Sequence, residues 1–305
     1  MLKKRLHGAG VELCSQFFSC LPPAWFDHPV ALGWRIASCF NPRVRANGAV
    51  RAEIGREVLN VPLAQALGAR SMPWRESLID RRIYHGRRLR PTEVWPDLQD
   101  VATALATEIS KIQSERPGQP VIVSPFHYVS QYANIYVIDA LRALLKLESI
   151  SVVSGVPNNR YGDDAAQIPG VKVLYTYGDA QRNGLGLRVA RALRRNGAAV
   201  LFADVPPFTL HRFPMQTVEV SMFGRSARIH NGVFRLGAPL DAMLLAFYLH
   251  FEQGHFSARL FDPLQLSAAG APQQLANCIE QAMVDNYADW LFSGHPSMYA
   301  FSPSK

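Results

Sequence analysis

One histidine of this chain follows an apolar strand closely enough to lie at the edge of a sheet. His127 comes three residues after the segment 120–124 (PVIVS), a short run rich in β-branched side chains. An imidazole titrates near neutral pH, so a neutral ring at this place could accept the proton of a substrate hydroxyl. The other interpretation is a structural histidine with satisfied hydrogen bonds, which is the commoner role of an isolated histidine. His127 is therefore a candidate general base.

Asp204 is the second candidate, because it occupies a similar position after another apolar strand. It follows residues 198–203 (AAVLFA) and precedes Val205-Pro206-Pro207. A carboxylate there could bind a cation, a hydroxyl or an arginine, or it could serve only in a turn or as a helix cap. His127 and Asp204 are the two residues that we expect to be catalytic.

Several common catalytic and cofactor-binding motifs are missing from the sequence. It contains no GxSxG, no Walker A loop and no GxGxxG; Gly184-Leu-Gly186 lacks the third glycine and a preceding strand. No group of His, Asp and Glu has metal-ligand spacing, and the four cysteines form no CxxC pair. We therefore expect no metal and no cofactor, and we expect the three cysteines near the N-terminus to be buried free thiols, namely Cys14, Cys20 and Cys39.

The elements that would position these residues alternate between helices and strands. Residues 97–116 have apolar side chains at helical spacing and predict an amphipathic helix. Further helices are expected at 130–146, 186–196, 231–237 and 271–290, and further strands at 149–154, 171–175, 198–203, 217–222, 242–250 and 255–261. This alternation predicts an α/β fold, with a central, mostly parallel or mixed sheet flanked by helices. Functional groups in such sheets collect beyond the carboxyl ends of strands, where His127 and Asp204 both fall.

Residues 1–96 form a different region, which is rich in Arg, Pro and Trp and only weakly periodic. We expect an N-terminal segment of helices and loops that covers one side of an α/β domain formed by residues 97–305. The apolar run at 11–21 is shorter than the about 20 residues that span a bilayer. Because basic residues precede it, it suits a helix lying on a membrane surface, or equally a helix packed on the domain.

The chain is basic, with a formal net charge of +8 and a pI of about 9.5. Such a balance favours anionic partners: phospholipid headgroups, nucleic acid or an acidic carrier protein. Arginines cluster at 81–90 and at 182–195, either as solvated faces or as binding surfaces. No nucleic-acid-binding module accompanies either cluster, so we do not expect a nucleic acid partner.

Four segments in this order resemble the late acyltransferases of lipid A synthesis, the lauroyl and myristoyl transferases of the lysophospholipid and lipid A acyltransferase superfamily. The first segment is similar to the family's strand followed by the catalytic histidine motif. The second is similar to the family's helix, basic turn, apolar strand and Pro-Asp-Gln-like block. The third is similar to its Phe-Phe-Gly to Leu-Ala series, and the fourth, loosely, to its Trp-rich end. The segments are 121–132 (VIVSPFHYVSQY), 188–207 (RVARALRRNGAAVLFADVPP), 222–247 (MFGRSARIHNGVFRLGAPLDAMLLAF) and 286–301 (NYADWLFSGHPSMYAF).

In that family a sugar or glycerol hydroxyl attacks an acyl thioester. The family motif is His-x-x-x-x-Asp/Glu, in which the histidine is the general base and the carboxylate holds its ring. His127 matches the histidine, but Tyr132 stands at the acidic position, with Gln131 beside it. Three outcomes are open: Tyr132 or Gln131 orients His127 by a neutral hydrogen bond, a carboxylate from elsewhere such as Asp204 replaces the missing one, or the chemistry has been lost.

The resemblance implies an acyltransferase that moves a fatty acyl chain onto a hydroxyl or amine of a lipid-like acceptor, peripherally at the cytoplasmic face of a bacterial inner membrane. The implied partners are an acyl carrier protein or acyl-CoA donor, a lipid acceptor and an anionic membrane surface. Two alternatives are a degenerate relative that binds lipid or a partner protein, and an acyltransferase for a secondary-metabolite lipid. The implied substrate-binding residues are Tyr132, Gln131, Arg188, Arg191 and Arg225.

Overall fold

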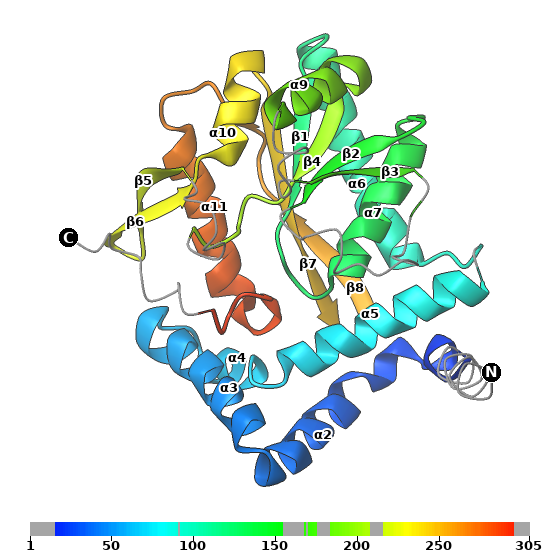
Figure 1. Cartoon of the computed structure of the whole chain (residues 1–305), viewed down its shortest axis with the longest axis vertical. Helices are drawn as coiled ribbons and strands as arrows, with labels where there is room; N and C mark the ends of the chain where they lie inside the picture. Colours follow the sequence, from blue (N-terminus) through cyan, green and yellow to red (C-terminus); the bar gives the residue numbers. More distant parts are fainter. Residues whose placement is uncertain are drawn as a thin grey trace.

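A computed structural model describes residues 16–90, 92–154, 168, 170–175, 184–207 and 216–295 (Figure 1). The chain has an α/β fold in which a seven-stranded, mostly parallel sheet is flanked by helices. A set of N-terminal helices lies along one end of the sheet, at the bottom of Figure 1. The predicted fold class is confirmed.

The central sheet has the strand order β3-β2-β4-β1-β7-β8, with β9 paired to β7. Strands β3, β2, β4, β1 and β7 are parallel, whereas β8 and β9 pair antiparallel with β7. β1 is buried along its whole length, as expected for a strand covered on both faces. The strands are β1 (Val121–Pro125), β2 (Ile150–Ser154), β3 (Val171–Tyr175), β4 (Ala198–Leu201), β7 (Met243–Glu252), β8 (His255–Leu260) and β9 (Leu264–Gln265).

The helices around the sheet begin and end within a few residues of the predicted positions. α6 packs on α7 and β8, and it buries the apolar stripe that predicted it: Leu98, Val101, Leu105, Ile109 and Ile112. These helices are α6 (Pro96–Glu115), α7 (Gln131–Leu144), α9 (Leu185–Asn196), α10 (Gly232–Gly237) and α11 (Ala271–Asn286). The strand and helix periodicities in this part of the sequence therefore gave correct element types.

The N-terminal helices cross the end of the sheet to which β7 points in Figure 1. α5 contacts α7 on one side and α2 on the other, while Phe26 at the start of α2 stacks on Phe251 of β7 at 6.0 Å. Among the described helices, none combines the length and apolar character that crossing a membrane would require. The elements are η1 (Pro23–Trp25), α2 (Asp27–Phe40), α3 (Pro42–Glu53), η2 (Ile54–Val58), α4 (Leu63–Gly68) and α5 (Met72–Leu89).

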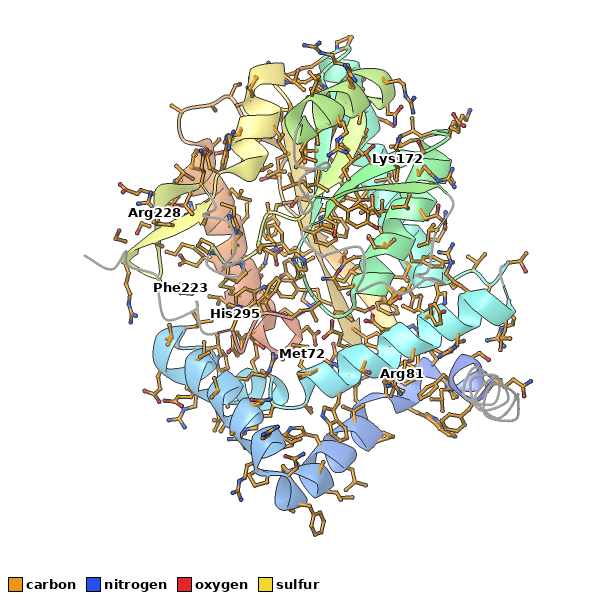
Figure 2. All side chains as sticks on the ribbon, in the orientation of Figure 1. Met72, Arg81, Lys172, Phe223, Arg228 and His295 are labelled. Atoms are coloured by element: carbon orange, nitrogen blue, oxygen red, sulfur yellow. The ribbon has the colours of Figure 1, made fainter. Side chains whose placement is uncertain are left out.

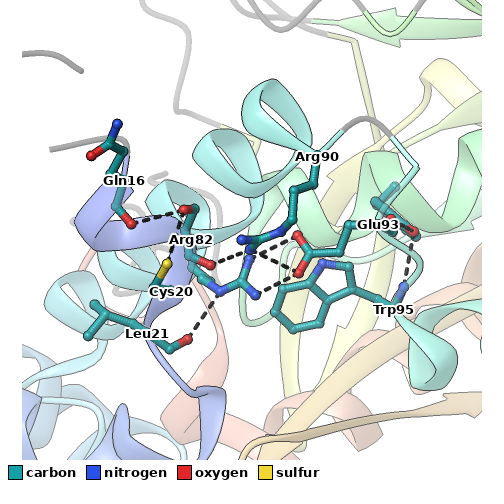
Figure 3. Close-up of polar contacts among 9 residues, drawn as sticks. Gln16, Cys20, Leu21, Arg82, Arg90, Glu93 and Trp95 are labelled. Carbon is teal, nitrogen blue, oxygen red and sulfur yellow. Dashed lines mark hydrogen bonds and ion pairs between the residues drawn. The ribbon is translucent and has the colours of Figure 1, made fainter. Parts of the chain in front are cut away.

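A buried arginine fastens this N-terminal region to the rest of the chain (Figure 3). Arg82 of α5 donates from Nε to the carbonyl oxygen of Leu21 at 3.1 Å and forms an ion pair with Glu93 at 2.8 Å. Its guanidinium carbon lies 5.0 Å from the ring centroid of Trp95, at cation–π distance. Because Glu93 and Trp95 lead into α6, this one side chain connects the segment before η1, helix α5 and the loop that begins the α/β part.

The sequence analysis missed two strands, the two-residue β9 and the longer β6. β5 (Thr217–Met222) was predicted, but it pairs antiparallel with the unpredicted β6 (Arg225–His230) in a separate two-stranded sheet. Phe223 and Gly224 connect the two strands with φ angles of 50° and 68°, which is typical of the two-residue type I′ turn of hairpins. The turn is held by the Phe223 N–H, which donates to Glu280 Oε2 at 2.7 Å.

The prediction for the N-terminal cysteines was wrong where it can be checked. Cys20 and Cys39 are exposed, and Cys14 lies outside the described residues. Part of the apolar run at 11–21 also lies outside them, although residues 16–20 are helical. The prediction assumed that a cysteine among apolar residues is buried. In this region the apolar residues lie on both sides of the helices, so such a cysteine can be exposed.

Candidate active site

His127 and Asp204 come together at the carboxyl edge of the sheet. β1 and β4 are parallel neighbours in which Val123 pairs with Val200. His127 and Asp204 each lie four positions beyond that pair, so the register brings them out side by side. His127 Nδ1 is 2.7 Å from Asp204 Oδ1. A carboxylate from a second strand therefore contacts the ring, which was one of the outcomes left open by the sequence.

The Asp204 carboxylate is buried, and both of its oxygens accept hydrogen bonds. Oδ2 accepts from the His127 backbone N–H at 2.7 Å and from Trp290 Nε1 at 3.2 Å, while Oδ1 faces His127 Nδ1. All three contacts place a nitrogen of His127 or Trp290 against an oxygen of this carboxylate. The bond to Oδ1 then assigns the ring proton to Nδ1 and leaves the Nε2 lone pair available as a base.

Two phenylalanines form the walls around the His127 ring. The ring centroids of Phe202 and Phe292 lie 4.5 Å and 4.7 Å from that of His127. The His127 side chain is 10% exposed, and no described residue is recorded as a hydrogen-bond partner of Nε2. The imidazole is therefore largely desolvated, in apolar surroundings, but it is not completely enclosed.

Backbone hydrogen bonds fix the loop that carries His127. The Val129 N–H donates to the carbonyl oxygen of Asp289 at 2.9 Å, and the Leu291 N–H donates to that of His127 at 2.8 Å. Val129 has a φ of 65°, in the left-handed region that β-branched residues rarely adopt. Contacts with the C-terminal segment thus hold a conformation that the loop would not favour alone.

A second carboxylate holds the other end of this loop. Asp80 of α5 accepts hydrogen bonds from the Ser130 hydroxyl and, at 3.4 Å, from the Tyr132 N–H. Ser130 is in turn the N-cap of α7 and accepts from the Ala133 N–H at 3.0 Å. Burial raises the pKa of Asp80 to about 6, although the hydrogen bonds from Ser130 and Tyr132 act in the opposite direction.

Glu76 lies one helical turn before Asp80 and shares its environment. Burial raises the pKa of Glu76 to about 7, and the neighbouring negative charge of Asp80 adds to the rise, while Arg51 opposes it. The Arg51 guanidinium also donates to Ser293 Oγ at 2.6 Å. Close to the His127 loop, therefore, two carboxyl groups with raised pKa values lie beside the half-buried guanidinium of Arg51.

The five predicted substrate-binding residues lie on three different elements, α7, α9 and β6. Gln131 and Tyr132 open α7, and the Tyr132 ring lies edge-on to Tyr84 at 5.9 Å. Arg188 and Arg191 are on α9, and Arg225 begins β6. None of these five contributes to the hydrogen bonds and ring contacts of His127 and Asp204 described above.

The sequence analysis missed three residues around the His127–Asp204 pair. Trp290 and Phe292 belong to a segment that was recognised only as a Trp-rich end, and Asp80 belongs to the weakly periodic N-terminal region. The signal available for Trp290 was a large aromatic residue with one polar group, which needs a partner when buried. Asp80 carries no comparable local signal.

The sequence matches no known family model, and no curated protein matches it either. What the chain does must therefore be inferred from the chemistry of the His127–Asp204 pair and its surroundings.

Proposed function

We propose that the chain is an acyltransferase that uses His127 as general base and Asp204 to orient and polarise it. The observation that supports this most is the 2.7 Å contact between His127 Nδ1 and Asp204 Oδ1, with Nε2 on the opposite side of the ring. This is the tautomer and polarity that a hydroxyl nucleophile requires. The ordered resemblance to lipid A late acyltransferases supplies the reaction class.

In the proposed reaction the acceptor hydroxyl loses its proton to His127 Nε2 as its oxygen forms a bond to the thioester carbonyl carbon. The carbon–sulfur bond then breaks, and the leaving thiolate takes the proton back from Nε2. Asp204 remains ionised and stabilises the imidazolium that exists between these two transfers. No net proton is gained or lost by the enzyme.

The surroundings of the pair suit a fatty acyl chain. Phe202 and Phe292 border the imidazole, and Phe223, which we also expect near the acyl chain, lies at the turn of the β5–β6 hairpin. Arg188, Arg191 and Arg225 would contact phosphates of a carrier-bound or CoA-bound donor or of a lipid acceptor. The proposed setting is the inner face of a bacterial membrane, with the protein bound peripherally.

Acyl transfer from labelled acyl carrier protein or acyl-CoA to a lipid extract tests the proposal. His127→Ala should lower turnover about 10²- to 10⁴-fold, the range that general base catalysis contributes. Equal turnover of His127→Ala and the wild type, with both proteins equally folded by circular dichroism, would remove His127 from the mechanism.

A non-catalytic lipid- or partner-binding relative is the second candidate. It is favoured by Tyr132 at the motif's acidic position and by the 10% exposure of the His127 side chain. It predicts salt-sensitive binding to anionic vesicles with no transfer to any acceptor. Transfer to a lipid other than lipid A, abolished by His127→Ala, would instead identify the secondary-metabolite alternative.

A further inference from the structure

One side of α2 carries large apolar side chains that remain open to solvent. Steps of seven and four residues return to the same side of a helix, and four residues beginning just before α2 follow these steps. We call them the α2 face: Trp25, Leu32, Ile36 and Phe40, which are 65%, 60%, 54% and 85% exposed. Cys39, which is also exposed, lies in the same stretch of helix.

The opposite side of α2 makes the contacts with the protein. Val30 is buried there. Gly33 is so close to Trp74 that a Cβ atom at position 33 would lie 3.5 Å from its ring. Trp34 packs so tightly on Gly48 of α3 that a Cβ atom there would lie 2.5 Å from the indole. The α2 face is thus not needed to hold the helix on the protein.

The charged residues of the segment that contains α2 and most of α3, residues 25–52, are mostly positive. Between residues 25 and 52 the only acidic residue is Asp27, which forms an ion pair with Arg75 at 3.2 Å. The same stretch contains three exposed arginines, Arg35, Arg43 and Arg45. A surface of this kind is complementary to anionic headgroups next to an apolar layer.

The α2 face also lies on the same end of the molecule as the candidate active site. α5 contacts both α2 and α7, and Asp80 of α5 is hydrogen-bonded to Ser130, three residues after His127. In Figure 2 several side chains of α2 lie along the lower edge of the protein. A lipid surface bound there would be one helix layer from the His127 loop.

We propose that the α2 face docks on an anionic lipid bilayer, with α2 lying in the plane of the headgroups. A helix of 14 residues is about 21 Å long, which suits an interfacial orientation and not a span. Tryptophan is favoured at this depth because its ring has an apolar body and a polar N–H group. A second copy of the chain is a poorer occupant, since pairing two α2 faces would bring two sets of arginines together.

Co-sedimentation with vesicles tests this proposal. Wild-type protein should bind phosphatidylethanolamine vesicles that contain phosphatidylglycerol, should bind vesicles of phosphatidylcholine alone much less, and should be released by salt. Replacing the apolar residues, L32S/I36S/F40S, should weaken binding at least about tenfold. Replacing the arginines, R35Q/R43Q/R45Q, should weaken it about fivefold for each arginine lost.

Two control variants locate the binding surface. L144S/L187S/V284S removes three exposed apolar side chains from α7, α9 and α11 and should leave binding unchanged. R191Q/R194Q/R195Q removes three exposed arginines from α9, the other basic helix. If this second variant loses vesicle binding while L32S/I36S/F40S retains it, the bilayer contacts α9 and the proposal is wrong.

Two further outcomes would also overturn it. One is equal vesicle binding by the wild type and L32S/I36S/F40S. The other is a dimer in light scattering that L32S/I36S/F40S abolishes, with no vesicle binding by the wild type, which would assign the α2 face to self-association.

This inference rests on the proposed function only for its biological setting, and the two fail separately. His127→Ala should lose acyl transfer and still bind vesicles. L32S/I36S/F40S should bind vesicles poorly and still transfer acyl chains to an acceptor dispersed in detergent. Because the replaced residues are exposed, the thermal unfolding temperature of L32S/I36S/F40S should match that of the wild type.

Discussion

The loop that carries His127 is held at its start by Asp204 and at its end by Asp80, and the two carboxylates have different surroundings. Asp204 faces three N–H groups, from the His127 backbone, the His127 ring and Trp290. Asp80 receives one hydroxyl and one backbone N–H and has Glu76 beside it. Three N–H groups thus orient the first carboxylate, whereas burial raises the pKa of the second, Asp80, to about 6.

The two carboxylates have different tasks: Asp204 orients the His127 ring, and Asp80 holds the start of α7. A carboxylate that orients a general base must hold the ring in one position, and the hydrogen bonds from the His127 backbone and Trp290 fix the Asp204 carboxylate for that task. A carboxylate that caps a helix can be partly protonated, because a neutral carboxyl group still accepts a hydrogen bond from Ser130. We therefore expect Asp204 to matter for rate and Asp80 with its neighbours to matter for stability.

The largest expected effect is on the rate with Asp204→Asn. The amide keeps the shape but cannot stabilise an imidazolium, and it can hold the ring in the wrong tautomer. The analogous change in serine proteases costs about 10⁴ in kcat, and we expect a loss of that order in acyl transfer. Single-turnover transfer from a labelled thioester donor measures it.

Asp80→Asn is the matched control for that experiment, because it makes the same chemical change at the other end of the loop. Its rate should fall much less than that of Asp204→Asn, because Asp80 contacts Ser130 and Tyr132 and not the His127 ring. Comparable losses in the two variants would erase the distinction between the two carboxylates.

The next effect concerns stability and pH at Glu76. Its folded-state pKa of about 7 lies above the ordinary value of 4.5, so between these values the folded protein binds more protons than the unfolded chain. The free energy of unfolding therefore falls as pH rises through this window. Glu76→Gln removes the cost of ionising this buried carboxyl group. The free energy of unfolding of the variant, relative to that of the wild type, should therefore rise by about 2–3 kcal/mol between pH 5 and pH 8.

Urea unfolding of both proteins at several pH values gives this difference. Glu53→Gln, which changes an exposed glutamate of α3, should show a difference from the wild type that does not vary with pH. A flat difference for Glu76→Gln as well would mean that Glu76 is ionised without penalty inside the protein.

The smallest effect is expected for Ser130→Ala. The change removes the N-cap of α7 and the hydroxyl that Asp80 accepts, and it should cost about 1 kcal/mol of stability. Ser110→Ala in α6 is a suitable control, because Ser110 is exposed and bonds only to the carbonyl oxygen of Ala106 in its own helix. A change of less than about 0.5 kcal/mol for both would show that the cap contributes nothing measurable.

The position of the His127–Asp204 pair could be predicted from the sequence because it depends on local patterns. Both residues follow short apolar runs, and parallel strands deliver the residues after them to one edge of the sheet. The choice between Tyr132 and Asp204 as the partner of His127 could not be made, since it depends on the register of β1 and β4. That register is set by packing across the whole sheet.

The N-terminal region was predicted poorly for a physical reason. Apolar side chains lie on both sides of α2, with Val30 buried and Leu32 exposed, so no single stripe marks the inner side. The same ambiguity explains the wrong expectation for Cys39. Asp80 was missed because its partner Ser130 comes fifty residues later and no local sequence pattern predicts the contact.

The bond from the Trp290 indole to Asp204 has a consequence for how the protein matures. The histidine and the tryptophan are separated by 163 positions, so the polar cluster can close only after α11, which precedes Trp290, has been synthesised. A nascent chain that has emerged only as far as α11 would contain His127 and Asp204 without the indole. The complete set of hydrogen bonds around Asp204 therefore requires a long-range contact that local folding around β1 and β4 cannot supply.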